Sequence, residues 1–239
     1  MKKSIALSLM LLAATASIAS AAAGLNLSWT SCGVTGASNK TFACNSNTGT
    51  NLMAASYTAP SGTTAISGNE VVIDLAAAAA TLPDWWKFKN AGSCRLSSLS
   101  ANQGPTVGCN DYWAGQATPA IAGYQIGLFG ANSARIKGIV ATGVAFQGPL
   151  TAGDEYLSMN VVINNTKTVG SPSCTGCATA VCIVLNEIKV TQPVGLGDYR
   201  IQNPADRNYV NWQSAGGPSC PGATPTQTKT WGSVKALYR

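Results

Sequence analysis

Cysteine is the most reactive residue type in this 239-residue chain, because the sequence contains eight cysteines and no histidine. The cysteines are Cys32, Cys44, Cys94, Cys109, Cys174, Cys177, Cys182 and Cys220. Thiols can form disulfides, hold zinc, or exchange electrons as a C-x-x-C pair such as Cys174 and Cys177. Thiol oxidoreductases place that pair at a helix start, whereas Pro172 and Ser173 indicate a loop here. A zinc site without histidine would need four thiolates, such as those of Cys174, Cys177, Cys182 and Cys220, or acidic ligands. The sequence favours disulfides, because an exported protein enters an oxidising compartment.

Sequence proximity predicts how these cysteines pair. We expect the disulfides Cys32–Cys44, Cys94–Cys109, Cys174–Cys177 and Cys182–Cys220. The first three close short loops or a tight turn, and the fourth joins a strand to the C-terminal tail. Each short-loop bond would add about 2–4 kcal/mol to the free energy of unfolding, mainly by restricting the unfolded chain. The sequence predicts no metal site and no cofactor.

The missing histidine also excludes the Ser-His-Asp and Cys-His arrangements of nucleophilic catalysis. The motifs G-x-S-x-G and G-x-x-x-x-G-K-[ST] are absent as well. A pair of carboxylates could still hydrolyse a glycosidic bond. The candidates are Glu70, Asp74, Asp84, Asp111, Asp154, Glu155, Glu187, Asp198 and Asp206. None lies in a catalytic motif, so a carbohydrate-active enzyme is an alternative hypothesis and a non-catalytic protein is favoured.

Aromatic side chains give the more specific indication of a binding site. Trp85, Trp86, Tyr112 and Trp113 are the candidate binding residues, because exposed tryptophan and tyrosine rings stack on sugar rings. Successive residues of a strand point to opposite faces, so at most one of Trp85 and Trp86 is expected to be exposed. The alternative is that these rings belong to the core, with their polar atoms bonded at its edge.

The first 23 residues have the pattern of a secretory signal peptide. The basic start Met1-Lys2-Lys3 precedes an apolar run that includes residues 5–14, and small residues end the segment at Ala21 to Ala23. We expect cleavage after Ala21 or Ala23 and a secreted, periplasmic or extracellular protein. The remaining sequence contains no other run long enough to span a membrane, which takes roughly 20 apolar residues. No membrane partner is therefore expected after cleavage.

Charge and composition exclude further classes of protein. The chain has 15 basic and 9 acidic residues, and removing Lys2 and Lys3 leaves 13 against 9, a net charge of +4. The basic residues are scattered and form no patch, so no nucleic-acid partner is expected. With 46% hydrophobic and 10% charged residues, the sequence resembles neither a disordered segment nor a coiled coil.

Strand patterns separated by turn residues extend through the mature chain. Val71, Ile73 and Leu75 lie on one face at a period of two residues, and residues 124–128, 135–146, 155–163 and 181–190 give further strand patterns. The apolar phase changes within 181–190, which predicts a β-bulge near Asn186–Glu187 or burial on both faces. We expect 155–163 and 181–191 to pair antiparallel.

These patterns predict an all-β fold, a disulfide-stapled antiparallel β-sandwich of jelly-roll type. Thr230 could cap a short C-terminal helix that carries Trp231, Val234 and Leu237 on one face. No linker or repeat divides residues 24–239, so we expect a single domain, a size common for sandwiches.

Several segments together resemble a group of uncharacterised secreted bacterial proteins. They are the run 174–188, the segment 220–225 and the C-terminal TWGSVKALYR at 230–239, with 38–45 and 85–90. The resemblance covers most of the mature chain and implies an exported, single-domain bacterial protein. It implies no activity and no functional residues.

The sequence therefore favours an exported, non-catalytic module that binds a surface glycan or an envelope protein. A carbohydrate-active enzyme with an Asp/Glu pair is one alternative. An extracellular assembly subunit that docks through Trp231–Arg239 is the other.

Overall fold

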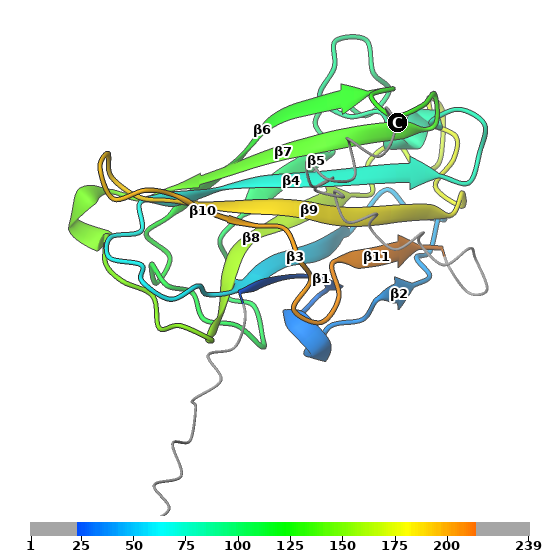
Figure 1. Ribbon diagram of the computed structural model, residues 1–239. Helices are drawn as coiled ribbons and strands as arrows, with labels where there is room; N and C mark the ends of the chain where they lie inside the picture. The colour runs from blue at the N-terminus through cyan, green and yellow to red at the C-terminus, as the bar shows by residue number, and fades with distance from the viewer. Residues whose placement is uncertain (1–22, 214–239) are drawn as a thin grey trace, which may run out of the picture.

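The computed structural model describes residues 23–213 and shows an all-β, sandwich-like fold (Figure 1). The strands are β1 (Gly24–Trp29), β2 (Asn39–Lys40), β3 (Thr50–Thr58), β4 (Gly68–Ala77), β5 (Leu99–Asn102), β6 (Thr118–Ile126), β7 (Ser133–Ala141), β8 (Glu155–Asn164), β9 (Val181–Thr191), β10 (Tyr199–Ile201) and β11 (Tyr209–Trp212). Three single turns of 3-10 helix join them: η1 (Gly33–Thr35), η2 (Asp84–Trp86) and η3 (Val144–Phe146). Within residues 23–213, no helix is long and apolar enough to cross a membrane.

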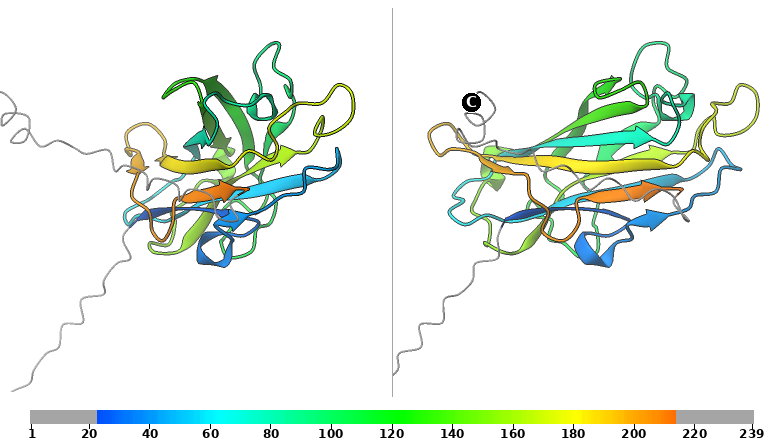
Figure 2. Two further views of the ribbon diagram at one scale, coloured as in Figure 1. Left: turned by 90° about the vertical axis from the view of Figure 1, so that its right-hand side faces the viewer. Right: turned by 45° about the vertical axis from the view of Figure 1, so that its right-hand side comes forward.

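Two sheets form the layers of the sandwich (Figure 2). The smaller sheet has the order β1-β3-β8-β5, and the larger has β2-β11-β9-β4-β7-β6, with β10 added beside β9. All strand pairs are antiparallel except β2 with β11. The antiparallel all-β prediction is confirmed.

One predicted strand pair is wrong. Strand β8 pairs with β3 and β5, whereas β9 pairs with β4, β10 and β11 in the other sheet. The long connection 165–180 lets the chain change sheets, and period-2 patterns carry no information on which sheet a strand joins. The predicted bulge is confirmed, because Val72 faces Glu187 and Ile73 faces Leu185, which leaves Asn186 as the extra residue.

The core lies between the sheets and includes the expected face of β4, since Val71, Ile73 and Leu75 are buried. Two tyrosines, Tyr57 on β3 and Tyr124 on β6, are buried with these side chains. Burial raises the pKa of both phenols above their ordinary value, because a phenolate would lose its hydration.

Alkaline pH should therefore destabilise the fold. Above about pH 10 the unfolded phenols ionise while the buried ones stay neutral, so the free energy of unfolding falls by up to about 1.4 kcal/mol per pH unit for each buried tyrosine. Urea unfolding between pH 9 and 11, run on the wild type and Tyr57→Phe, measures this slope. In the variant, the free energy of unfolding should fall less steeply with pH, by up to about 1.4 kcal/mol per pH unit, because one ionisable phenol is removed. Equal slopes in the two proteins would contradict a buried neutral Tyr57.

The disulfides link loops that are far apart in the sequence. The bonds are Cys32–Cys109, Cys44–Cys177 and Cys94–Cys174, with sequence separations of 77, 133 and 80 residues. The predicted pairs Cys32–Cys44, Cys94–Cys109 and Cys174–Cys177 are therefore wrong, because the fold brings together loops that are distant in the sequence. Cys182 is disulfide-bonded too, and its expected partner Cys220 lies outside the described residues, as do the predicted helix and Trp231.

Candidate functional site

The aromatic residues predicted to bind a ligand do not form an exposed platform. Trp85 and Trp86 are 0% exposed and Trp113 is 2% exposed, while Tyr112 is half-buried. The expectation of one outward ring assumed a strand, whereas Trp85 and Trp86 lie in the 3-10 turn η2, where both rings can face inward. The described tryptophans therefore offer no stacking surface for a sugar.

These rings form a packed aromatic cluster at one end of the core. Trp85 and Trp86 lie with their ring centroids 4.9 and 5.3 Å from that of Trp212. The guanidinium of the buried Arg95 lies 3.5 Å from the Trp85 ring centroid. Burial lowers the pKa of Arg95, because the cation has lost its hydration. The cluster is a structural feature of the core.

Arg95 is held by backbone carbonyl groups. It donates hydrogen bonds to the oxygens of Trp85 (2.8 Å), Thr166 (3.0 Å) and Asn164. Adjacent to it, the Cys94–Cys174 disulfide joins the same two loops. The cation thus fastens the 85–95 loop to the loop after β8.

The carboxylates that could have formed a hydrolytic pair are largely neutralised by cations. Five of the nine form ion pairs: Asp74–Arg135 (2.7 Å), Glu70–Lys189 (2.8 Å), Asp198–Lys189 (3.2 Å), Glu187–Arg200 (2.5 Å) and Asp84–Lys87 (2.7 Å). The Gln192 backbone N–H, with Lys189 nearby, holds the pKa of Asp198 below its usual range. A general acid needs the opposite direction of shift, so this arrangement does not support a glycosidase.

Two further carboxylates accept hydrogen bonds from backbone N–H groups or from neighbouring polar side chains. Asp111 accepts hydrogen bonds from the N–H groups of Trp113 and Gly115, which closes its own loop. Glu155 accepts from Asn26 (2.9 Å) and Ser56 (2.6 Å). Within residues 23–213, no group of three or more cysteine or acidic side chains is placed to hold a metal ion.

An unpredicted feature is a set of exposed apolar side chains on two neighbouring loops, residues 142–148 and 193–197. They are Val144, Phe146, Val194 and Leu196, and we call them the apolar loop end. Val144 is 83% exposed and Val194 is fully exposed. Both loops lie at the left end of the sandwich in Figure 1, where η3 and the turn between β9 and β10 are seen.

A buried glutamine fixes the loop 193–197. The Gln192 side-chain oxygen accepts hydrogen bonds from the N–H groups of Thr64 (2.8 Å) and Ala65 (3.1 Å). Its amide nitrogen donates to the carbonyl of Gly197 at 2.8 Å. Because Gln192 holds both the segment before β4 and the far side of the turn, residues 193–197 project from a rigid base.

The same segment before β4 also fixes the loop 142–148. The Ile66 N–H donates to the Gly148 carbonyl at 2.8 Å, and the Thr142 N–H donates to the Ser67 carbonyl at 3.1 Å. The backbone of η3 closes on itself through the Phe146 N–H and the Gly143 carbonyl at 3.0 Å. Residues 64–67 thus lie between the two loops and hold both.

The loops at this end of the sandwich carry no charged side chain, and the exposed Asp154 follows directly after residue 153. Residues 59–67, 142–153 and 193–197 contain no acidic or basic side chain. The acidic residue that follows the second loop, Asp198, is paired with Lys189. The sequence signal was present, because large apolar residues sit inside turn clusters such as Pro193-Val194-Gly195-Leu196-Gly197. The same clusters also mark the breaks between strands, so the sequence alone does not distinguish a displayed loop from an ordinary turn.

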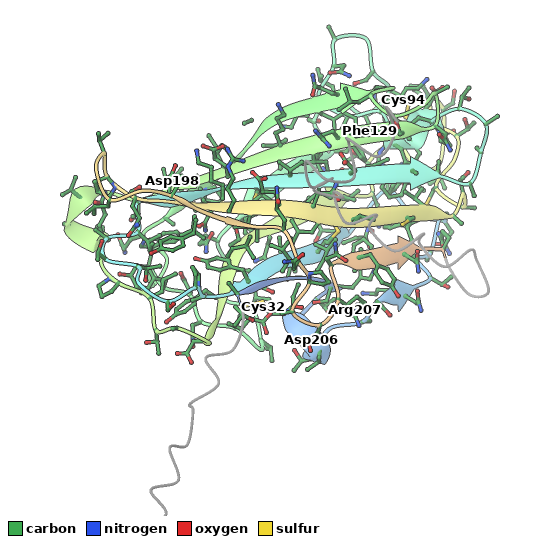
Figure 3. All side chains as sticks on the ribbon, viewed as in Figure 1. Cys32, Cys94, Phe129, Asp198, Asp206 and Arg207 are labelled. Carbon is green, nitrogen blue, oxygen red and sulfur yellow. A yellow bond between two sulfur atoms is a disulfide. The ribbon has the colours of Figure 1, made fainter. Side chains whose placement is uncertain are left out.

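A second exposed apolar group lies at the other end, on the β6–β7 turn. Leu128 and Phe129 are exposed there, with the Arg135 guanidinium 4.7 Å from the Phe129 ring centroid. Figure 3 labels Phe129 and Asp198 at opposite ends of the larger sheet. The loop end therefore differs from the β6–β7 turn in having four exposed apolar side chains and no basic residue within its two loops.

Comparison with known proteins gives no assignment for this arrangement. No family model, curated protein or solved structure matches the chain. Function is therefore argued from the site itself.

Proposed function

We propose that the protein is an exported, non-catalytic module that binds a component of the cell envelope through the apolar loop end. The observation that carries this proposal is the rigid presentation of four large apolar side chains in water. Hydrophobic side chains gain nothing for the fold when they are exposed, so a rigidly displayed set marks a contact surface. The disulfides support an oxidising compartment, as expected for an exported protein.

Of the partners considered from the sequence, the apolar loop end favours an apolar envelope component over a surface glycan. Sugar recognition uses exposed aromatic rings beside hydrogen-bonding side chains. The described tryptophans are buried, and Val144, Val194 and Leu196 provide no hydrogen-bonding groups. The ion-paired carboxylates give no support to the alternative of a carbohydrate-active enzyme.

Binding to isolated envelope fragments of the producing cell tests this proposal. The variant Phe146→Ser/Val194→Asp should bind about tenfold more weakly than the wild type, because two apolar contacts are lost and one charge is added. Co-sedimentation of the oxidised mature protein with the fragments measures the bound fraction. The matched control, Leu128→Ser/Phe129→Ser, changes the opposite tip and should bind as the wild type does. Equal binding by all three proteins would contradict the proposal.

A second candidate function, an assembly subunit, is favoured by the edge strand β6 of the larger sheet. The edge of β1 is covered, since Leu25 and Leu27 donate N–H groups to the carbonyls of Asn203 and Arg207. Strands β2 and β5 are short, whereas β6 is a nine-residue, uncharged edge strand. Such an edge can pair with another chain. Sedimentation velocity of the mature protein, with and without residues 230–239, would reveal self-association and whether the tail is its docking element.

Two finer expectations from the sequence remain part of this proposal. We infer a jelly-roll connection between the strands, and release of the mature chain after Ala21 or Ala23. Support for export comes from the signal-like sequence together with the disulfide framework.

A further inference from the structure

We infer that the partner of the apolar loop end is a lipid surface, into which its four side chains insert without any helix crossing the bilayer. This inference rests on the proposed function and names the chemistry of its partner. It departs from the sequence-based expectation that the mature protein has no membrane partner. Three properties of the loop end carry it: its shape, its bonded backbone, and its lack of charge.

The shape of the loop end suits a fluid partner. Val144 and Val194 stand at the tips of two separate loops and project almost completely into solvent. A protein partner would need a matching hollow around each tip to bury them. Lipid chains and headgroups rearrange around a projecting side chain, so no preformed hollow is required.

The backbone at the tips is already hydrogen-bonded within the protein. In the 193–197 turn, the Leu196 N–H donates to the Pro193 carbonyl at 3.1 Å, and Gln192 satisfies the Gly197 carbonyl. In η3, the Gln147 N–H donates to the Val144 carbonyl at 3.3 Å. Polar backbone groups without partners make entry into an apolar medium costly. Internal bonding removes part of that cost at both tips.

The charges around the loop end indicate which lipids it would contact. Residues 59–67, 142–153 and 193–197 carry no charge, and Lys189 nearby is neutralised by Glu70 and Asp198. An anionic membrane attracts proteins through unpaired lysine and arginine side chains. Binding driven by these loops should therefore be apolar, indifferent to lipid charge and insensitive to salt.

Flotation with vesicles of pure phosphatidylcholine tests the inference on the oxidised mature protein. The wild type should float with the vesicles to the same extent at 0.05 and 1 M salt, roughly a fourfold change in screening length. Phe146→Ser/Val194→Asp should lower the bound fraction about tenfold, and Leu128→Ser/Phe129→Ser should leave it unchanged. Because all four substituted side chains are exposed, the variants should fold, which thermal unfolding checks.

The outcomes separate this inference from the proposed function. No flotation of the wild type, flotation only with anionic vesicles at low salt, or equal flotation of both variants would overturn the lipid inference. If envelope fragments still bind in a manner that requires Phe146 and Val194, the proposed function stands with a protein or glycan partner. If neither vesicles nor envelope fragments bind, both fail.

Discussion

Replacing Cys44 and Cys177 together by alanine is expected to lower the free energy of unfolding by about 3–5 kcal/mol. The bond joins residues 133 apart in the sequence, so it removes many conformations from the unfolded chain. It also holds the segment around β2, a strand of only two residues, against the larger sheet. Few backbone hydrogen bonds are available there to replace the covalent link.

The contacts around this disulfide indicate where the fold would loosen. The Gln213 amide donates to the Phe42 carbonyl at 2.8 Å, and the Trp212 indole N–H donates to the Cys177 carbonyl at 2.7 Å. The Phe42 and Trp212 rings are stacked with their centroids 3.8 Å apart. Without the bond, the 41–49 segment could leave this stack, which would expose the aromatic cluster.

Urea unfolding without reductant, followed by tryptophan fluorescence, measures the loss. Lys87→Ala, which breaks an exposed ion pair with Asp84, is a control expected to change stability by about 1 kcal/mol or less. With reductant, the urea midpoints of the wild type and the double variant should nearly coincide, because the bond is then open in both proteins. A midpoint equal to that of the wild type without reductant would show that the bond stabilises little.

The disulfides show why local sequence patterns predicted the strands better than their arrangement. Alternation placed Val71, Ile73 and Leu75 on the core face because period 2 is a property of each strand by itself. The partner of Cys44 depends on two sheets meeting at one end, which involves residues more than a hundred positions away. Proximity in the sequence predicts disulfides that close short loops, and it carries no information on which distant loops the fold brings together.

The candidate site was missed for a related reason. The sequence marks Val144 and Phe146 as apolar residues in a turn, but a turn residue can be buried or exposed. What makes them exposed and rigid is the segment 64–67, fixed by Gln192 from another strand. Conversely, a strand pattern predicts that Trp85 and Trp86 point to opposite faces, whereas the 3-10 turn that follows Pro83 gives them a different periodicity.

Replacing Arg95 by methionine should cost about 3–5 kcal/mol of unfolding free energy. Methionine fills much of the volume but donates no hydrogen bond, so the carbonyls of Trp85, Asn164 and Thr166 lose their shared donor. Buried carbonyl groups without a partner each carry a desolvation penalty of about 1–3 kcal/mol. Some of that loss is offset because the buried cation itself no longer has to be dehydrated.

The variant Arg95→Lys separates the contribution of charge from that of geometry. Lysine keeps the positive charge but has no planar fork, so it cannot lie flat over the Trp85 ring while donating to carbonyls from two loops. We expect Arg95→Lys to be nearly as unstable as Arg95→Met, with a matching loss of near-ultraviolet circular dichroism from the Trp85 environment. If lysine restores wild-type stability, positive charge alone holds the loops together. If both variants are as stable as the wild type, the Cys94–Cys174 bond is sufficient to hold them.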